Sequence, residues 1–344
     1  MSHVRKLFPA VTLVVCAVAA AAQDAQERQR VTVDTFPRAE SDLYMARFVE
    51  DGAFGTFVHV RMPTPIDRQA VIRMNRDTLY SYAVADLEAG PVTITLPEAG
   101  ERFVSVQVIS QDHYVPFVIY APGEHTFTRE DIGTRYVLFL ARTFVDPENP
   151  DDLETVHGVQ DAMSVAQGDG AAFEIPDWDT EQADRLRDAL NRLAEANGGL
   201  ESGRMFGPEE AVDPVQHLIG TAAGWGGNPP TDAYYSGVTP ERNDGETIHR
   251  LTVGDVPVDG FWSISVYNAG GYFEENALGR YSINDVTADR APDGDVHVQF
   301  GGCTAEVPNC LPVTAGWNYL VRMYRPGPRI LDGSWTFPAA QPVE

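Results

Sequence analysis

The segment VIRMNRDTLYSYAVADL, residues 71 to 87, crowds polar side chains into an otherwise apolar stretch. If it begins as a strand, Val71, Arg73, Asn75 and Asp77 share one face, because side chains alternate between the two faces of a strand. An arginine and an amide on one face can bind an anionic or polyhydroxyl ligand, and a carboxylate beside them can act as a general base. We therefore predict ligand-binding roles for Arg73, Asn75 and Tyr80 and a catalytic role for Asp77.

A competing interpretation gives the same residues a structural role. Arg73 and Asp77 would then belong to an internal network that fixes a corner of the fold and leaves no group free for a ligand. The sequence alone leaves both interpretations open.

A second polar group lies near the C-terminus, where Arg280, Tyr281 and Arg322 offer cations beside aromatic faces. Arg322 and Tyr324 are two residues apart, so they point the same way if they lie on a strand. We predict that Arg280, Tyr281 and Arg322 bind the ligand from the opposite side. The alternative is an Arg–Tyr ladder stacked on an exposed sheet face.

Common catalytic signatures are missing from the sequence. It contains no Gly-x-Ser-x-Gly elbow, no His-Glu-x-x-His motif, no glycine-rich phosphate loop and no dinucleotide fingerprint. The histidines are scattered without a pair at ligand spacing, so we predict neither a metal site nor a cofactor.

The charge and lysine content of the chain limit the partners and the chemistry that it can have. The 344 residues include 25 basic and 50 acidic side chains, a net charge of −25, which repels nucleic acid and anionic membranes. Lys6 is the one lysine of the chain, so Schiff-base chemistry and a lysine base are excluded from any mature form that lacks it.

The N-terminus has the pattern of a secretory signal peptide. Arg5 and Lys6 precede an apolar run from Leu7 to Ala22 that ends in alanines. We expect cleavage near Ala22 and a periplasmic or secreted protein. No later segment approaches the length of about 20 apolar residues that a membrane span requires.

Two cysteines remain after residues 1–22 are removed, Cys303 and Cys310. In an oxidising compartment we expect them to form a disulfide. The closed loop of eight residues would stabilise the fold by about 2.5 kcal/mol through lost chain entropy.

Periodicity divides the chain into zones. After the signal peptide (1–22), residues 23–149 carry a leading helix and then period-two apolar runs typical of an antiparallel sandwich. Residues 150–230 have helical periodicity, with a glycine- and proline-rich connector, and residues 231–344 return to strands. RFVSVQVIS (102–110) and YVLFLAR (136–142) align with GFWSISVYN (260–268) and YLVRMYR (319–325), which pairs Arg142 with Arg325 and suggests a duplicated unit.

Longer motifs carry a family resemblance. RMNRDTLYSYAVADLEAGPVTITLPEAGERFVSVQVI resembles the bacterial DUF1254 domain. DGFWSISVYNAGGYFEENALGRYSI and NCLPVTAGWNYLVRMYRPGPRILDGSWTFP resemble the DUF1214 domain that usually follows it. The likeness runs from about residue 37 to 342 and implies a mainly β chain with a helical insert, in which two jelly-roll-like antiparallel β-sandwiches flank a helical segment. Many relatives have tryptophan where Cys310 stands. Both domains are of unknown function. Some relatives are labelled carboxylesterases, but this sequence contains no nucleophile motif, so no catalytic residue carries over.

Three functional hypotheses follow. The first is an exported protein that binds a small polar or anionic molecule between the two sandwiches. The second is a cofactor-independent hydrolase or lyase that uses Asp77 as base. The third is an envelope or assembly component, such as a homo-oligomer, that uses the sandwich faces as contacts.

Overall fold

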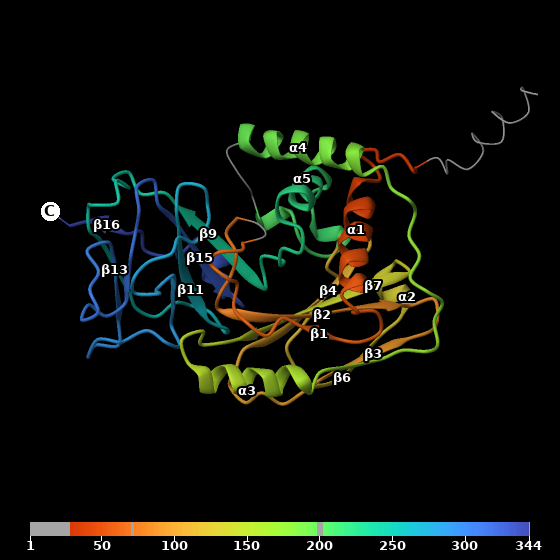
Figure 1. The fold of residues 1–344 in the computed structure, drawn as a ribbon, viewed down its shortest axis with the longest axis horizontal. Helices are drawn as coiled ribbons and strands as arrows, with labels where there is room; N and C mark the ends of the chain where they lie inside the picture. Colours follow the sequence, from red (N-terminus) through yellow and green to blue (C-terminus); the bar gives the residue numbers. More distant parts are fainter. Residues whose placement is uncertain (1–27, 70–71, 198–201, 344) are drawn as a thin grey trace, which may run out of the picture.

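The computed structural model describes residues 28–69, 72–197 and 202–343 of the chain. Two β-sandwiches lie side by side, and helices cover one side of the first of them (Figure 1). The mainly β architecture with a helical segment is therefore the one that the sequence predicted. The signal peptide expected at residues 1–22 lies outside the described residues.

The N-terminal sandwich is built on a five-stranded sheet with β7 at its centre. Its order is β1 (Val58–His59), β2 (Thr78–Asp86), β7 (Tyr136–Phe144), β4 (Val104–Ser110) and β5 (Phe117–Ile119), and every neighbouring pair is antiparallel. A three-stranded sheet of β6 (Gly123–Phe127), β3 (Val92–Leu96) and β8 (Ser164–Ala166) packs beneath it. Alternating apolar side chains from both sheets form the core between them, as period-two patterns require.

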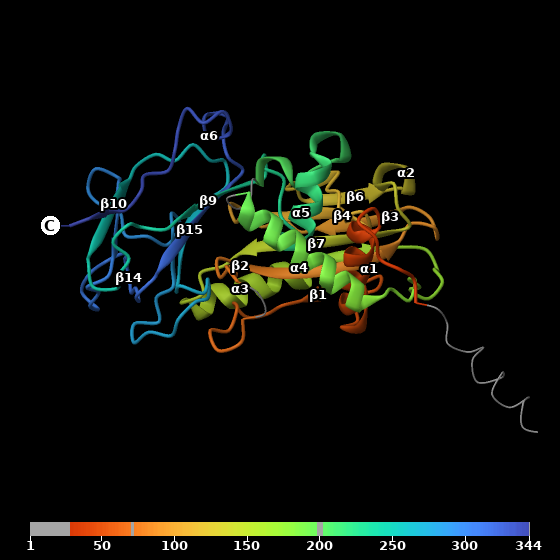
Figure 2. The same cartoon turned by 90° about the horizontal axis from the view of Figure 1, so that it is seen from above.

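Helices cover the other face of the five-stranded sheet, as both views show (Figures 1 and 2). They are α1 (Phe36–Glu50) and α5 (Pro214–Gly224), and α4 (Thr180–Ala196) packs on these two helices. With both faces covered, all nine residues of β7 are buried. Aspartates cap α4 and α5, and proline begins α5, which are the usual start signals of a helix. The shorter elements are α2 (Arg129–Ile132), α3 (Pro150–Asp161), η1 (Ser202–Arg204) and η2 (Glu209–Ala211).

The C-terminal sandwich joins two four-stranded sheets. One has the order β12 (Ser282–Asn284), β11 (Trp262–Tyr267), β15 (Asn318–Tyr324) and β9 (Ala233–Val238). The other has the order β14 (Cys310–Leu311), β13 (Val296–Phe300), β10 (His249–Val253) and β16 (Gln341–Pro342), with α6 (Pro328–Leu331) nearby in sequence. β13 and β14 are parallel, so this sheet is mixed. Trp262, Trp317, Tyr319 and Phe300 are buried in the core between the sheets.

Aromatic side chains join the two sandwiches. Phe103 and Phe144 from the first pack against Phe261 and Tyr324 from the second, with ring centroids 4.9 Å apart for Phe144 and Phe261 and 5.2 Å apart for Phe103 and Tyr324. Such pairs add to the free energy gained by burying their area. The junction is therefore a packed interface.

The structure moves three boundaries. Residues 72–77 form turns and irregular backbone, and β2 begins only at Thr78. Within the helical zone of residues 150–230, Pro208 followed by Glu209 and Glu210 predicts a helix start, but α5 begins at Pro214, after the short η2. β8 pairs with β3, so the N-terminal sandwich continues past residue 149 to Ala166 and includes α3. No helix within the described ranges is long and apolar enough to cross a membrane.

Candidate functional site

Asp77 sits at the junction of the sandwiches with a fully buried side chain. Its Oδ1 accepts hydrogen bonds from Ser282 Oγ and Asn284 Nδ2 of β12, each at 3.2 Å. Its Oδ2 is buried with no hydrogen-bond partner among the described residues. Burial raises the pKa of the Asp77 carboxyl, and the positive charge of Arg322 only partly offsets this.

Asn75 ties the same corner to both sandwiches. Its amide nitrogen donates to Thr78 Oγ1 at 3.0 Å and to the Tyr324 hydroxyl at 2.9 Å. Its Oδ1 accepts from the backbone N–H of Asp77 at 2.8 Å. All polar atoms of this amide are thus engaged by the protein.

Arg322 faces the same corner from β15 and is 3% exposed. Its guanidinium donates to the carbonyls of Arg73 (2.7 Å) and Met74 (3.2 Å) and to two side-chain oxygens, Ser265 Oγ and the Tyr267 hydroxyl, both at 2.9 Å. No carboxylate of the described residues lies within 4 Å of it, so backbone and hydroxyl oxygens hold this buried cation in place of an ion pair.

Arg142 of β7 is a second buried arginine, 5% exposed. It donates to Gln107 Oε1 (2.7 Å), Asn228 Oδ1 (3.1 Å) and the carbonyl of Gly226 (3.0 Å). Gly226 follows the C-terminal end of α5, where the helix dipole favours a cation. The Arg142 guanidinium also lies 5.5 Å from the centre of the Tyr80 ring. Arg142 therefore anchors the helical segment to the sheet.

The strand registers show the internal repeat and correct its alignment. Arg142 lies opposite Tyr80 on one neighbouring strand and Ser105 on the other. Arg322 lies opposite Tyr235 and Ser263 in the same way. The equivalent of Arg142 is therefore Arg322, three residues before the Arg325 that sequence alignment selected.

A cavity of about 260 Å³ opens beside this buried corner, lined by both sandwiches. Arg76 and the loop of residues 146–149 line it from the first, and residues 279–284, 287–289 and 308–310 line it from the second. The Arg76 guanidinium donates to the Thr64 carbonyl and lies 5.2 Å from the centre of the Tyr281 ring. Ser282 and Asn284 are also lining residues, so Asp77 lies one side chain behind the cavity wall.

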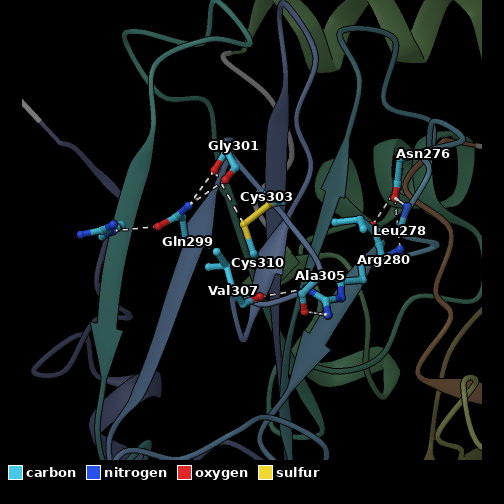
Figure 3. Close-up of a disulfide and its surroundings, with 11 residues drawn as sticks. Asn276, Leu278, Arg280, Gln299, Gly301, Cys303, Ala305, Val307 and Cys310 are labelled. Atoms are coloured by element: carbon cyan, nitrogen blue, oxygen red, sulfur yellow. Dashed lines mark hydrogen bonds between the residues drawn. A yellow bond between two sulfur atoms is a disulfide. The ribbon is translucent and has the colours of Figure 1, made fainter.

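The disulfide loop positions the second arginine of this cavity. Cys303 and Cys310 are bonded, with Cα atoms 5.5 Å apart, as the sequence predicted. Arg280 donates to two carbonyls of the loop that they close, Val307 at 2.9 Å and Ala305 at 3.4 Å (Figure 3). The loop thus fixes the Arg280 guanidinium beside the cavity.

A larger cavity of about 770 Å³ adjoins the first and shares Asp146, Asn149 and Thr287 with it. Its wall includes Phe103, Phe144, Phe261, Val159 and Val286. Charged residues also line it, and two of them, Arg102 and Asp152, pair with each other.

Comparison with known families finds a match in each of the two sandwiches. A model described as a protein of unknown function, DUF1254, matches residues 54–167, and a second with the same description, DUF1214, matches residues 233–328. The chain is a DUF1254/DUF1214 protein. The DUF1254 match ends one residue after β8, which agrees with the extent of the first sandwich.

One solved structure has a similar fold. The VPA0106 protein of Vibrio parahaemolyticus is 16% identical with a TM-score of 0.68, over 91% of this chain and all of that one. An uncharacterized protein from Burkholderia cenocepacia is also 16% identical, with a TM-score of 0.46, over 86% of this chain and 84% of that one. A search of curated proteins gave no match.

The DUF1254 corner differs from the strand that the sequence predicted. Arg73 has a left-handed backbone (φ 55°) and an exposed side chain, and its carbonyl is the group that meets Arg322. The single face expected for Val71, Arg73, Asn75 and Asp77 does not form, and Val71 lies outside the described residues. Tyr80 is half-buried on β2.

Six of the seven predicted site residues divide between two layers, and the seventh, Arg73, has an exposed side chain that does not line the smaller cavity. Asp77, Asn75, Tyr80 and Arg322 belong to the buried layer at the junction, whereas Arg280 and Tyr281 line the smaller cavity. Arg76, Ser282 and Asn284 were missed. The sequence could have indicated Ser282 and Asn284, because they are two residues apart on a short strand of the DUF1214 domain and so point to the same face.

Proposed function

We propose that the chain is an exported binding protein that holds a small polar or anionic molecule in the smaller cavity, between the DUF1254 and DUF1214 domains. The observation that carries this proposal is that each domain contributes an arginine to one cavity, Arg76 from the first and Arg280 from the second. Neither arginine has a carboxylate within 4 Å in the described part of the chain. A ligand carboxylate can therefore bind them without displacing an internal ion pair.

Export belongs to the proposal. It is supported by the signal-peptide pattern that ends near Ala22 and by the Cys303–Cys310 disulfide, a bond that persists in oxidising compartments. Mass spectrometry of protein from a periplasmic or culture-medium fraction should find a mature chain that begins near Gln23. A full-length chain confined to the cytoplasm would contradict export.

Binding is tested by ligand-dependent thermal stabilisation across a panel of small acids, sugars and amino acids. A binding compound should raise the melting temperature of the wild type but not of Arg280→Gln. Arg290→Gln is a matched control, because Arg290 also donates to two backbone carbonyls of the DUF1214 domain but does not line the cavity. Equal stabilisation of both variants would contradict the proposed site.

A second candidate function is a cofactor-independent hydrolase or lyase. The observation that favours it is the Ser282 hydroxyl, which lines the cavity and donates to Asp77 Oδ1. A serine beside a carboxylate base is the beginning of a nucleophilic pair, and Arg76 or Arg280 could stabilise developing negative charge. Asp77→Asn should then abolish turnover in a hydrolase and lyase screen without lowering the melting temperature, whereas turnover that survives this change would exclude Asp77 as the base.

A further inference from the structure

The smaller cavity is lined by charged side chains of both signs that form no ion pair within 4 Å in the described part of the chain. Its cations are Arg76 and Arg280, which are held by backbone carbonyls. Burial lowers the pKa of the Arg76 guanidinium, which shows that this cation is partly stripped of water. A desolvated cation without a carboxylate gains more from an incoming anionic group than a hydrated one does.

Carboxylates line the same cavity. Asp146 and Glu148 come from the loop between β7 and α3, and Asp289 comes from the segment after β12. None of the three belongs to an ion pair in the described part of the chain. No three potential metal-ligating side chains there come together as a metal site would require. Asp146 Oδ1 accepts a hydrogen bond from the backbone N–H of Glu148 at 3.1 Å, which leaves its negative charge without a cation partner, so these acids can meet a ligand cation.

The charge of the whole chain bears on which ligand fits. At a net charge of −25 the protein repels small anions at long range, so a simple anion would approach against the field. A simple cation would be drawn in but would leave the two arginines unmatched. A molecule with one group of each sign avoids both difficulties.

The adjoining cavity indicates what else the molecule carries. It is reached past the shared residues Asp146, Asn149 and Thr287, and Phe103 and Phe261 contribute to its wall. A ligand with its charged groups in the smaller cavity can extend an apolar group against this wall, which removes apolar surface from water.

We infer that the ligand is a small zwitterion of the amino-acid class with an apolar side chain. Its carboxylate is bound by Arg76 and Arg280, and its ammonium group by Asp146 and Glu148. This inference rests on the proposed binding function and narrows it.

The test uses three matched probes and calorimetry on the full mature protein. L-phenylalanine carries both charges, N-acetyl-L-phenylalanine lacks the cation, and L-phenylalaninamide lacks the carboxylate. We expect L-phenylalanine to bind about 10-fold to 100-fold more tightly than either analogue, because each analogue loses charge-assisted hydrogen bonds.

Two variants separate the contribution of the cavity cations from that of the cavity carboxylates. Arg280→Gln should weaken L-phenylalanine and N-acetyl-L-phenylalanine but leave L-phenylalaninamide unchanged. Glu148→Gln should weaken L-phenylalanine and L-phenylalaninamide but not the N-acetyl compound. Glu148 is exposed, so this second variant tests the inference even if Arg280→Gln folds poorly.

The outcomes distinguish the inference from the function beneath it. If N-acetyl-L-phenylalanine binds as tightly as L-phenylalanine, the zwitterion inference fails and anion binding stands. If none of the three probes binds while a sugar or simple acid stabilises the wild type but not Arg280→Gln, the inference fails and the proposed function stands. If no compound in the panel stabilises the wild type, both fail.

Discussion

Replacing both disulfide cysteines, in Cys303→Ala/Cys310→Ala, should destabilise the DUF1214 domain. The bond closes a loop of eight residues, since the two cysteines are seven positions apart. Loop-closure entropy for that length corresponds to about 2.5 kcal/mol. For a domain of roughly 110 residues, at about 4 °C per kcal/mol, the melting temperature should fall by about 10 °C.

The same change should weaken ligand binding through Arg280. Without the bond, the carbonyls of Ala305 and Val307 that hold its guanidinium are free to move. Calorimetry should therefore show both a lower melting temperature and a lower affinity for any ligand of the smaller cavity.

Adding a reductant distinguishes the effect of losing the disulfide bond from the effect of replacing the cysteine side chains. Reduced wild type keeps both sulfur atoms, so it should melt like the double variant if the bond itself matters. The double variant should not respond to reductant. If the double variant and the reduced wild type both melt within about 2 °C of the oxidised protein, other contacts hold the loop and the entropy argument is wrong. The bonds between Asn309 and the backbone of Asp289 are the first candidates for such contacts.

Three further predictions concern the junction and the sheets around it. The pKa of Asp77 in the folded protein is raised above 3.8, so the free energy of unfolding of wild type should fall as the pH rises from that value. Denaturant unfolding should therefore show Asp77→Asn becoming more stable relative to wild type from pH 4 to pH 7. A stability difference that is independent of pH would show that the pKa of this carboxyl does not change on folding. Arg322→Met should cost about 3–5 kcal/mol of unfolding free energy, because it removes the hydrogen bonds from the guanidinium to the Arg73 and Met74 carbonyls and to two buried hydroxyl groups and leaves Asp77 without its nearby cation, whereas Arg290→Met should change little. In α3, a Cβ added at Gly158 meets open space, so Gly158→Ala should raise the free energy of unfolding by about 0.5–1 kcal/mol. Gly260→Ala would place a Cβ 2.6 Å from the Tyr324 carbonyl oxygen and should destabilise the protein. Equal effects of the two substitutions would contradict the packing described at the junction.

The sequence predicted the parts of the fold that depend on local periodicity. Period-two runs gave the strands around β4 and β7, and apolar spacing gave α4 and the body of α5, although the start of α5 lies at Pro214 and not near Pro208. The disulfide also followed from the spacing of two cysteines and the expected compartment.

The corner at residues 72–77 could not be predicted because its shape depends on distant groups. Arg73 adopts a left-handed backbone that alternation rules do not foresee, and its N–H donates to the carbonyl of Gly271, which is far along the chain. The polar residues there were recognised as unusual, but whether they faced a ligand or each other depended on Ser282, Asn284 and Arg322, which only the folded chain brings to them.

The buried layer and the cavity depend on each other. Asp77 and Asn75 bond to the DUF1214 domain, and Arg322 bonds back to the DUF1254 domain, so polar contacts in both directions fix the separation of the two domains. Because each of these groups would be left unsatisfied if the domains moved apart, opening the junction is costly. The cavity beside it is therefore formed before a ligand arrives, and binding needs little rearrangement of the domains. The structural corner that the sequence allowed is thus the inner layer of this junction, and the proposed ligand site is the adjacent cavity, which Arg76 and Arg280 line.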